Sequence, residues 1–156
     1  MKRFIALFLA LVCVCALVSC SNTPDEPVTV SFNGEHEYFA VLNGSIVLND
    51  TEEVFDGGDL EITQSGVFEA VASYSTTFYT FVEGKQRVIM SNSVIDQTGG
   101  SVNVEGDLGK ASGKGIVIGS KVNKIEDLRE NLWFELKVTD LNGTENTYQI
   151  QLTLTD

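Results

Sequence analysis

Apolar and polar residues alternate along most of the chain after Val28. Val28, Val30 and Phe32 fall on one side of an extended segment, with polar residues between them. The clearest two segments come near the end of the chain, and their apolar sets are Leu132, Phe134, Leu136 and Val138, then Tyr148, Ile150, Leu152 and Leu154. Successive side chains of a strand point to opposite faces, so this period of two predicts strands with one buried face.

Short turn-forming sequences separate the alternating segments. Asn43-Gly44 is typical of a tight hairpin turn, Asn33-Gly34 lies between two further segments, and the stretches 83–86 and 141–144 predict two more hairpins. About ten short strands with turn signals every 8–12 residues are typical of a two-sheet sandwich. The pattern therefore predicts an all-β fold, a two-sheet antiparallel sandwich over residues 28–156.

Helical spacing occurs in one stretch after Val28, residues 123–131. Ile125 and Leu128 lie three residues apart there, and Asn123 precedes them as a candidate cap. We expect one short helix that crosses between the two sheets.

The first residues follow a different pattern. Met1, Lys2 and Arg3 are followed by an apolar run from Phe4 to Val18, about 15 residues, whereas a bilayer-spanning helix needs about 20. A basic start, a short apolar run and a small residue at its end are typical of a secretory signal peptide. We therefore assign residues 1–19 to a signal peptide and residues 20–27, with prolines at 24 and 27, to a tether.

The end of the apolar run reads Leu17-Val18-Ser19-Cys20. This sequence resembles the lipobox of bacterial lipoproteins, and the stretch 32–50 also resembles small bacterial lipoproteins. The resemblance implies that the signal is cut before Cys20, that the Cys20 thiol carries a diacylglyceryl group, and that the new amine accepts a further fatty acyl chain such as palmitate. Two or more acyl chains give stable anchoring, which would place the protein on the extracytoplasmic face of a cell membrane. The alternative is an ordinary secretory signal with Cys20 left as a free thiol.

A second resemblance covers about 35 residues at the end of the chain. The short helical stretch followed by the segments 133–140 and 145–154 looks like the last two strands of an immunoglobulin-like domain, with Trp133 near a corner aromatic. The cysteine pair of many such domains is missing, because the three cysteines are Cys13, Cys15 and Cys20. The resemblance implies the disulfide-free, immunoglobulin-like form of the sandwich.

The chain is strongly acidic. Its net charge is −12, and removal of residues 1–19 would take away Lys2 and Arg3 and leave −14. This balance argues against nucleic acid as a partner. It leaves a basic protein or a cell-wall component among the partners to consider.

An acidic stretch offers the candidate metal ligands. Asp50, Glu52, Asp56 and Asp59 are weak candidates for Ca²⁺, with Asn49, Glu53 and Glu61 nearby. Their spacing differs from that of an EF-hand loop, and alternate strand residues face opposite ways. We expect a solvated acidic turn, no bound metal and no cofactor.

Catalytic candidates are few. His36 is the only histidine, and no Gly-x-Ser-x-Gly nucleophile motif accompanies it. The glycine-rich stretch 105–119 differs from a phosphate-binding loop, because three residues instead of four separate Gly109 from Gly113-Lys114. We expect a loop histidine, a flexible glycine-rich loop that leads into a strand, a further short strand at 102–104, and no catalytic residues.

The aromatic residues Tyr74, Phe78, Tyr79 and Phe81 form the last candidate group. On one strand Tyr79 and Phe81 share a face and Phe78 takes the other. We expect one side in the core and a covered face on the other; an exposed Tyr79 face could instead bind a glycan or a protein.

Together these patterns predict a lipid-anchored cell-envelope lipoprotein whose sandwich is a non-enzymatic binding or accessory module. The alternative function is an acidic inhibitor or protective factor against a basic envelope-active protein. A small hydrolase is disfavoured by the single histidine.

Overall fold

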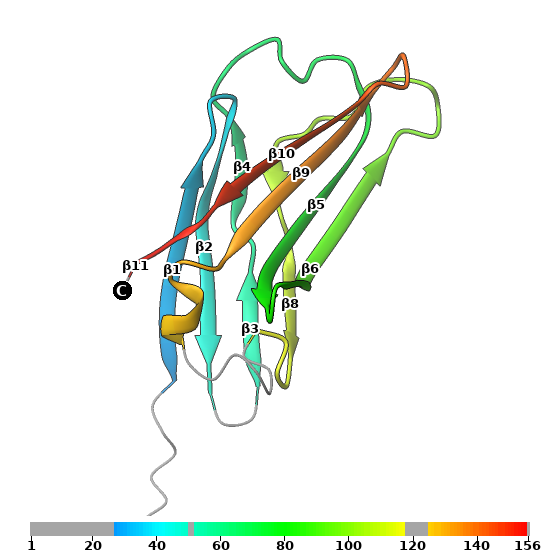
Figure 1. Cartoon of the computed structure of the whole chain (residues 1–156). Helices are drawn as coiled ribbons and strands as arrows, with labels where there is room; N and C mark the ends of the chain where they lie inside the picture. Colours follow the sequence, from blue (N-terminus) through cyan, green and yellow to red (C-terminus); the bar gives the residue numbers. More distant parts are fainter. Residues whose placement is uncertain (1–26, 50–51, 118–124, 156) are drawn as a thin grey trace, which may run out of the picture.

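The computed structural model of the protein describes residues 27–49, 52–117 and 125–155. They form two antiparallel β-sheets that pack face to face (Figure 1). The predicted two-sheet antiparallel sandwich is confirmed. The elements are β1 (Val28–Glu35), β2 (Phe39–Leu48), β3 (Glu53–Asp56), β4 (Asp59–Ile62), β5 (Val71–Val82), β6 (Lys85–Ile95), β7 (Gly106–Asp107), β8 (Lys110–Gly113), the 3₁₀ helix η1 (Ile125–Leu128), β9 (Trp133–Asp140), β10 (Glu145–Gln151) and β11 (Thr153–Thr155).

The two sheets have different strand orders. The first sheet runs β11-β1-β2-β3-β8, and β2 also pairs with β4, which pairs with β7. The second sheet runs β10-β9-β5-β6. Strand β2 pairs with β1 along one edge, and along its other edge its first half pairs with β4 and its second half with β3.

Aromatic rings from both sheets meet in the core. From the first sheet, the Phe32 and Phe55 rings stack with centroids 5.3 Å apart. Phe78 of the second sheet reaches both of them, at 5.9 and 5.0 Å, and also contacts Phe134 on its own sheet at 5.0 Å. All four side chains are fully buried, as the alternation of apolar residues predicts.

Both Asn-Gly pairs lie inside strands, so the predicted hairpin turn at Asn43-Gly44 is wrong, and Asn33-Gly34 is not the boundary between two strands. Asn33-Gly34 belongs to β1 and Asn43-Gly44 to β2, and the register between these strands shifts between Phe32 and Gly34. The Asn33 Oδ1 accepts a hydrogen bond from the Asn43 backbone N–H at 2.9 Å, and Asn43 has a φ of 60°. The positive φ that favours asparagine in a turn is used here for a β-bulge.

The other two predicted hairpins are confirmed. Glu83 and Gly84 join β5 to β6 with φ values of 52° and 74°, as a two-residue primed turn requires. Between β9 and β10 the Asp140 Oδ1 accepts hydrogen bonds from the Asn142 and Thr144 backbone N–H groups, both at 2.8 Å. These bonds to the charged form hold the pKa of the Asp140 carboxyl below its usual value, and the Thr144 N–H is the main cause.

The structure differs from three local predictions, namely the strand at 102–104, the glycine-rich loop at 105–119 and the helix at 123–131. Parts of the last two stretches lie outside the described residues. Residues 102–104 are not a strand, and the stretch 105–119 contains β7 and β8 before it becomes irregular at 114–117. The expected helix over 123–131 is the single 3₁₀ turn η1, which leads from the first sheet to the second, while Asn123 and residues 118–124 lie outside the described residues.

Gly44 offers a test of how tightly the core is packed. It lies opposite the fully buried Phe32 in the β1–β2 register, and a Cβ added at Gly44 would overlap the Phe32 ring. Overpacking of this kind typically costs about 1–3 kcal/mol. We expect Gly44→Ala to lower the free energy of unfolding in urea by that amount, and Ser45→Ala to change it much less. Equal stability of the two variants would show that the ring can move aside.

Candidate functional site

The described members of the weak Ca²⁺ candidate set, Glu52, Asp56 and Asp59, make separate contacts. Asp56 Oδ2 forms a salt bridge with Lys110 Nζ at 2.7 Å, and this partner raises the pKa of Lys110. Asp59 Oδ2 accepts a hydrogen bond from Asn43 Nδ2 at 3.3 Å. Glu52 has its backbone N–H bound to the Asn49 Oδ1, and Asp50 lies outside the described residues. In residues 27–49, 52–117 and 125–155, no three His, Cys, Asp or Glu side chains come together as a metal site.

The neighbouring acids also serve other parts of the fold. Glu53 Oε2 accepts a hydrogen bond from the Val117 backbone N–H at 2.7 Å, which ties β3 to the irregular segment after β8. Glu61 lies exposed on β4. The stretch therefore contributes to the structure of the first sheet at separate points.

His36 is part of the turn between β1 and β2. Its Nδ1 accepts a hydrogen bond from the Tyr38 backbone N–H at 3.2 Å. Its ring stacks on Phe39 with centroids 4.9 Å apart, and it meets Tyr148 edge-on at 5.3 Å. These contacts make His36 a packing residue of a turn, in agreement with the expected loop position.

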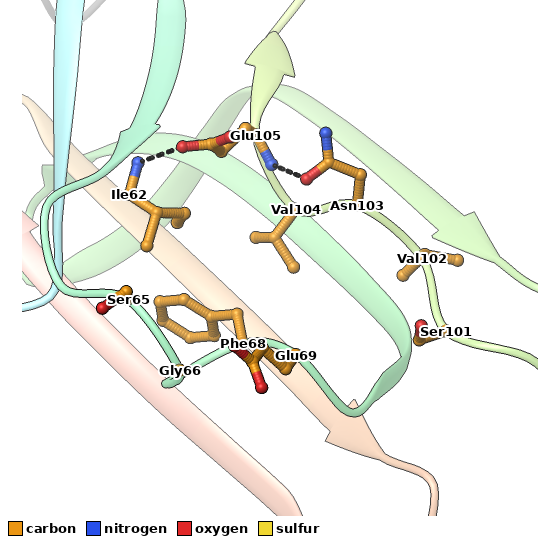
Figure 2. Close-up of a pocket in the computed structure, with 10 residues that line it drawn as sticks. All are labelled: Ile62, Ser65, Gly66, Phe68, Glu69, Ser101, Val102, Asn103, Val104 and Glu105. Carbon is orange, nitrogen blue, oxygen red and sulfur yellow. Dashed lines mark hydrogen bonds between the residues drawn. The ribbon is translucent and has the colours of Figure 1, made fainter.

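A depression of about 540 Å³ lies at one end of the sandwich (Figure 2). The segment after β4 and the segment before β7 form its walls, with Phe68 and Val104 facing each other across it. Glu105 Oε1 accepts a hydrogen bond from the Ile62 backbone N–H at 3.1 Å, and the Glu105 N–H donates to Asn103 Oδ1 at 3.3 Å. The end pocket is thus an opening onto the edge of the core with an acidic rim.

The predicted aromatic group splits between two environments. Phe78 is fully buried in the core, and Tyr74 packs against the same side. Tyr79 and Phe81 point out of the second sheet, on the face that does not meet the first sheet. The expectation of a covered outer face holds for Tyr79, which is 2% exposed, but not for Phe81, which is 43% exposed.

Trp133 completes this outer group. It is the direct cross-strand partner of Tyr79, and the two rings lie 6.5 Å apart with nearly parallel planes. Phe81 meets both rings edge-on, at 5.6 Å from Tyr79 and 6.3 Å from Trp133. We call Tyr79, Phe81 and Trp133 the aromatic cluster. Burial beneath its neighbours raises the pKa of the Tyr79 hydroxyl, and the nearby Glu135 carboxylate adds to the shift.

Asn131 fixes the backbone under the cluster. Its Nδ2 donates to the Phe81 carbonyl at 2.8 Å, and its Oδ1 accepts from the Phe81 N–H at 2.9 Å. Strand β9 starts only at Trp133, so the amide of Asn131 takes the place of a strand beside Phe81. The exposed ring is therefore held on a fixed piece of backbone.

Polar side chains continue the same face away from the cluster. Thr77 Oγ1 and Ser91 Oγ hydrogen-bond across β5 and β6 at 3.1 Å, and Gln149 Nε2 donates to Glu135 Oε2 at 2.7 Å across β10 and β9. Farther along, Lys137 Nζ pairs with Glu145 Oε2 at 2.8 Å. A depression of about 310 Å³ lies at that end, lined by Ser73, Tyr74, Ser75, Ser93, Ile95, Lys137, Thr139 and Glu145.

This outer face of the second sheet is the surface best suited to binding. It offers apolar rings at one end and hydroxyl, amide and paired ionic groups along the remaining length. Such a face can stack against a ligand and exchange hydrogen bonds with it. Sequence reasoning identified Tyr79 and Phe81 but placed Trp133 at a corner; only the β5–β9 register brings all three together.

Comparison with known proteins adds no assignment, since no family model, curated protein or solved structure matches the chain. The immunoglobulin-like character of the sandwich therefore stays a prediction. Within the part of the chain that the structure describes, no helix has the length and apolarity needed to cross a membrane. Cys20 lies outside that part, so its lipid attachment also stays a prediction.

The dispersed acids lead to a test with metal. Asp56 and Asp59 bind different side chains, so neither is free to join a common oxygen cage. We expect the midpoint of thermal unfolding to be the same in about 5 mM Ca²⁺ as in excess EDTA, because a ligand raises it only by binding the folded state. A clear rise with Ca²⁺, abolished by Asp56→Asn, would contradict this assignment.

Proposed function

We propose that the chain is the precursor of a lipid-anchored cell-envelope protein whose β-sandwich is a non-enzymatic binding module. The observation that carries the binding role is the aromatic cluster, because three large rings stand on a sheet face outside the core. Large aromatic side chains on a fixed, partly exposed face are typical of binding surfaces.

The anchoring role is supported by the sequence. The order of a basic start, an apolar run, the residues Leu17-Val18-Ser19-Cys20 and a polar tether matches an acylated and exported protein. After removal of residues 1–19, the seven residues from Ser21 to Pro27 would span at most about 25 Å. The sandwich would then stand close to the membrane surface, on its extracytoplasmic side.

The position of Val28, where the described sandwich begins, supports this proposal. Val28 begins β1 at one end of the sandwich, and the end pocket lies at the opposite end, where the chain turns after β1 and β4 (Figure 1). The outer face of the second sheet runs along the side between these two ends. Anchoring at Cys20 would leave both the pocket and the outer face open to the envelope space.

Intact-mass analysis tests the anchor. We expect the protein extracted from membranes to begin at residue 20 and to carry the mass of a diacylglyceryl group, with or without a further acyl chain. Cys20→Ala should abolish the added mass and leave the membrane fraction depleted, because the thiol is the attachment point. An unmodified product released into the medium by the native chain would contradict the proposal. Ser21→Ala is the matched control and should change nothing.

One observation supports a second function, that of an acidic inhibitor or protective factor. Asp59 of β4 and Asp107 of β7 are direct cross-strand partners, and both are exposed. Like charges directly opposite each other are unfavourable, and Asp107 also acts on Lys110, whose pKa it helps Asp56 to raise. An acidic protective factor that captures a basic envelope-active protein would use such a surface, together with the net charge of −14 that would remain after removal of residues 1–19.

Salt dependence and charge-matched variants distinguish this alternative. If it holds, a labelled ten-residue oligolysine peptide should bind the protein at about 50 mM salt and be released at about 300 mM. Asp59→Asn combined with Asp107→Asn should weaken binding roughly tenfold more than Glu126→Gln combined with Glu130→Gln, which removes the same net charge elsewhere. Equal effects of the two pairs would mean that only the net charge attracts the peptide.

A further inference from the structure

We propose that the outer face of the second sheet binds a neutral glycan chain, laid along the strands from the aromatic cluster toward the depression beside Ser93. This inference rests on the proposed binding function and adds the chemical class of the ligand.

The aromatic cluster suits the apolar side of a sugar ring. Carbohydrates carry C–H groups on the faces of the ring and hydroxyl groups around its edge, so an aromatic ring can contact the face while polar side chains reach the edge. Trp133 and Tyr79 lie nearly parallel, with an angle of 17° between their planes, and Phe81 stands almost perpendicular to Tyr79, at 88°. Tyr79 is only 2% exposed, so the ring surface open to a sugar comes from the half-buried Trp133 and the exposed Phe81, while Tyr79 packs beside both rings.

The polar groups beside the cluster fit hydroxyl groups. Outward positions on the four strands carry hydroxyl and amide side chains, which both donate and accept hydrogen bonds, and Gln149 and Thr77 are among them. A ligand rich in hydroxyl groups can both accept hydrogen bonds from these side chains and donate hydrogen bonds to them.

The charges on this face favour a neutral ligand. Lys137 is already paired with Glu145, and Glu135 accepts a hydrogen bond from Gln149. An anionic polymer would meet no free cation among these groups and would be repelled by the net charge of −12. A basic polymer would find a stronger attraction at the exposed acids of the first sheet, Asp59 and Asp107.

The length of the face fits a chain better than a single sugar. From Tyr79 to Ser73 along β5 the distance is about 20 Å, at roughly 3.3 Å per residue. The aromatic cluster lies at one end of this path and the 310 Å³ depression at the other. A longer glycan could contact the aromatic cluster and the depression at the same time, so we expect affinity to rise with the number of linked sugars.

Trp133 supplies a direct signal, because it is the only tryptophan of the chain. The experiment uses the full chain, extracted from membranes in detergent. We would titrate it with cello-, chito- and laminari-oligosaccharides of two to six units and with muramyl glycan fragments from cell wall, and follow Trp133 fluorescence. Binding should quench or blue-shift the emission, and the hexamer should bind at least tenfold more tightly than the dimer. The muramyl fragments carry lactyl carboxylates and serve as the anionic comparison, so binding of these fragments as tight as that of the neutral chains would contradict the assignment to a neutral glycan.

Two variants test the two ends of the face. Phe81→Ala removes the exposed ring and should weaken binding at least tenfold. Ser93→Tyr fills the depression and should abolish the gain from dimer to hexamer. Ser31→Tyr, at an exposed position on the outer side of β1, is the matched control and should bind like the native chain. Equal unfolding midpoints would confirm that each variant folds.

The contrary outcomes separate this inference from the proposed function. No fluorescence response to any glycan would overturn the glycan assignment. If a photo-crosslinker at position 93 then joined the chain to an envelope protein or to a second copy, the face would still be a binding surface and the proposed function would stand. If neither glycans nor crosslinks were found, both would fail. A response unchanged by Phe81→Ala and Ser93→Tyr would move glycan binding away from this face and overturn the inference.

Discussion

The contact of Phe78 with the phenylalanine rings of both sheets is the interaction on which the rest of the structure depends. Phe78 lies within 5.9 Å of Phe32, Phe55 and Phe134. The residues after Cys20 include no cysteine, so no disulfide holds the two sheets together. Packing must therefore supply that link, and buried aromatic pairs contribute both their large area and about 0.5–1.5 kcal/mol each from ring geometry. With the inner faces committed to this contact, only outer faces and ends remain for binding.

Strand β5 contributes residues both to the core and to the outer binding face. Its inward residue Phe78 builds the core, while its next residue, Tyr79, starts the aromatic cluster on the opposite face. A bulge in the register with β6 falls between these two positions, where Phe78 faces Met90 and Tyr79 faces Val88. The extra residue of this bulge, Ile89, belongs to β6, whereas the pairing of β5 with β9 continues unshifted through both positions. Phe78 and Tyr79 therefore keep the strand alternation that places one ring in the core and the other on the outer face.

The alternation of residues was enough to predict the sandwich, because a period of two is a local property of each strand. It was not enough at Asn33-Gly34 and Asn43-Gly44, where the same local preference for positive φ serves a turn or a bulge. The choice depends on the Asn33 side chain, which accepts the Asn43 N–H across two strands. The place of Trp133 in the candidate site could not be predicted for a similar reason. It lies opposite Tyr79 because β5 pairs with β9, and these two strands are far apart in the sequence.

Anchoring and glycan binding would reinforce each other if both proposals hold. A single exposed face of stacked rings and hydrogen bonds typically binds weakly, because ordering a flexible ligand offsets much of the contact energy. A lipid on Cys20 would hold the start of β1 within about 25 Å of the membrane, since the seven residues Ser21–Pro27 reach no farther. A glycan within that layer would meet the face at a high effective concentration, in the millimolar range for short linkers. Weak affinity per face would then be sufficient to hold the envelope layer and the membrane in contact, and it would leave each contact free to exchange.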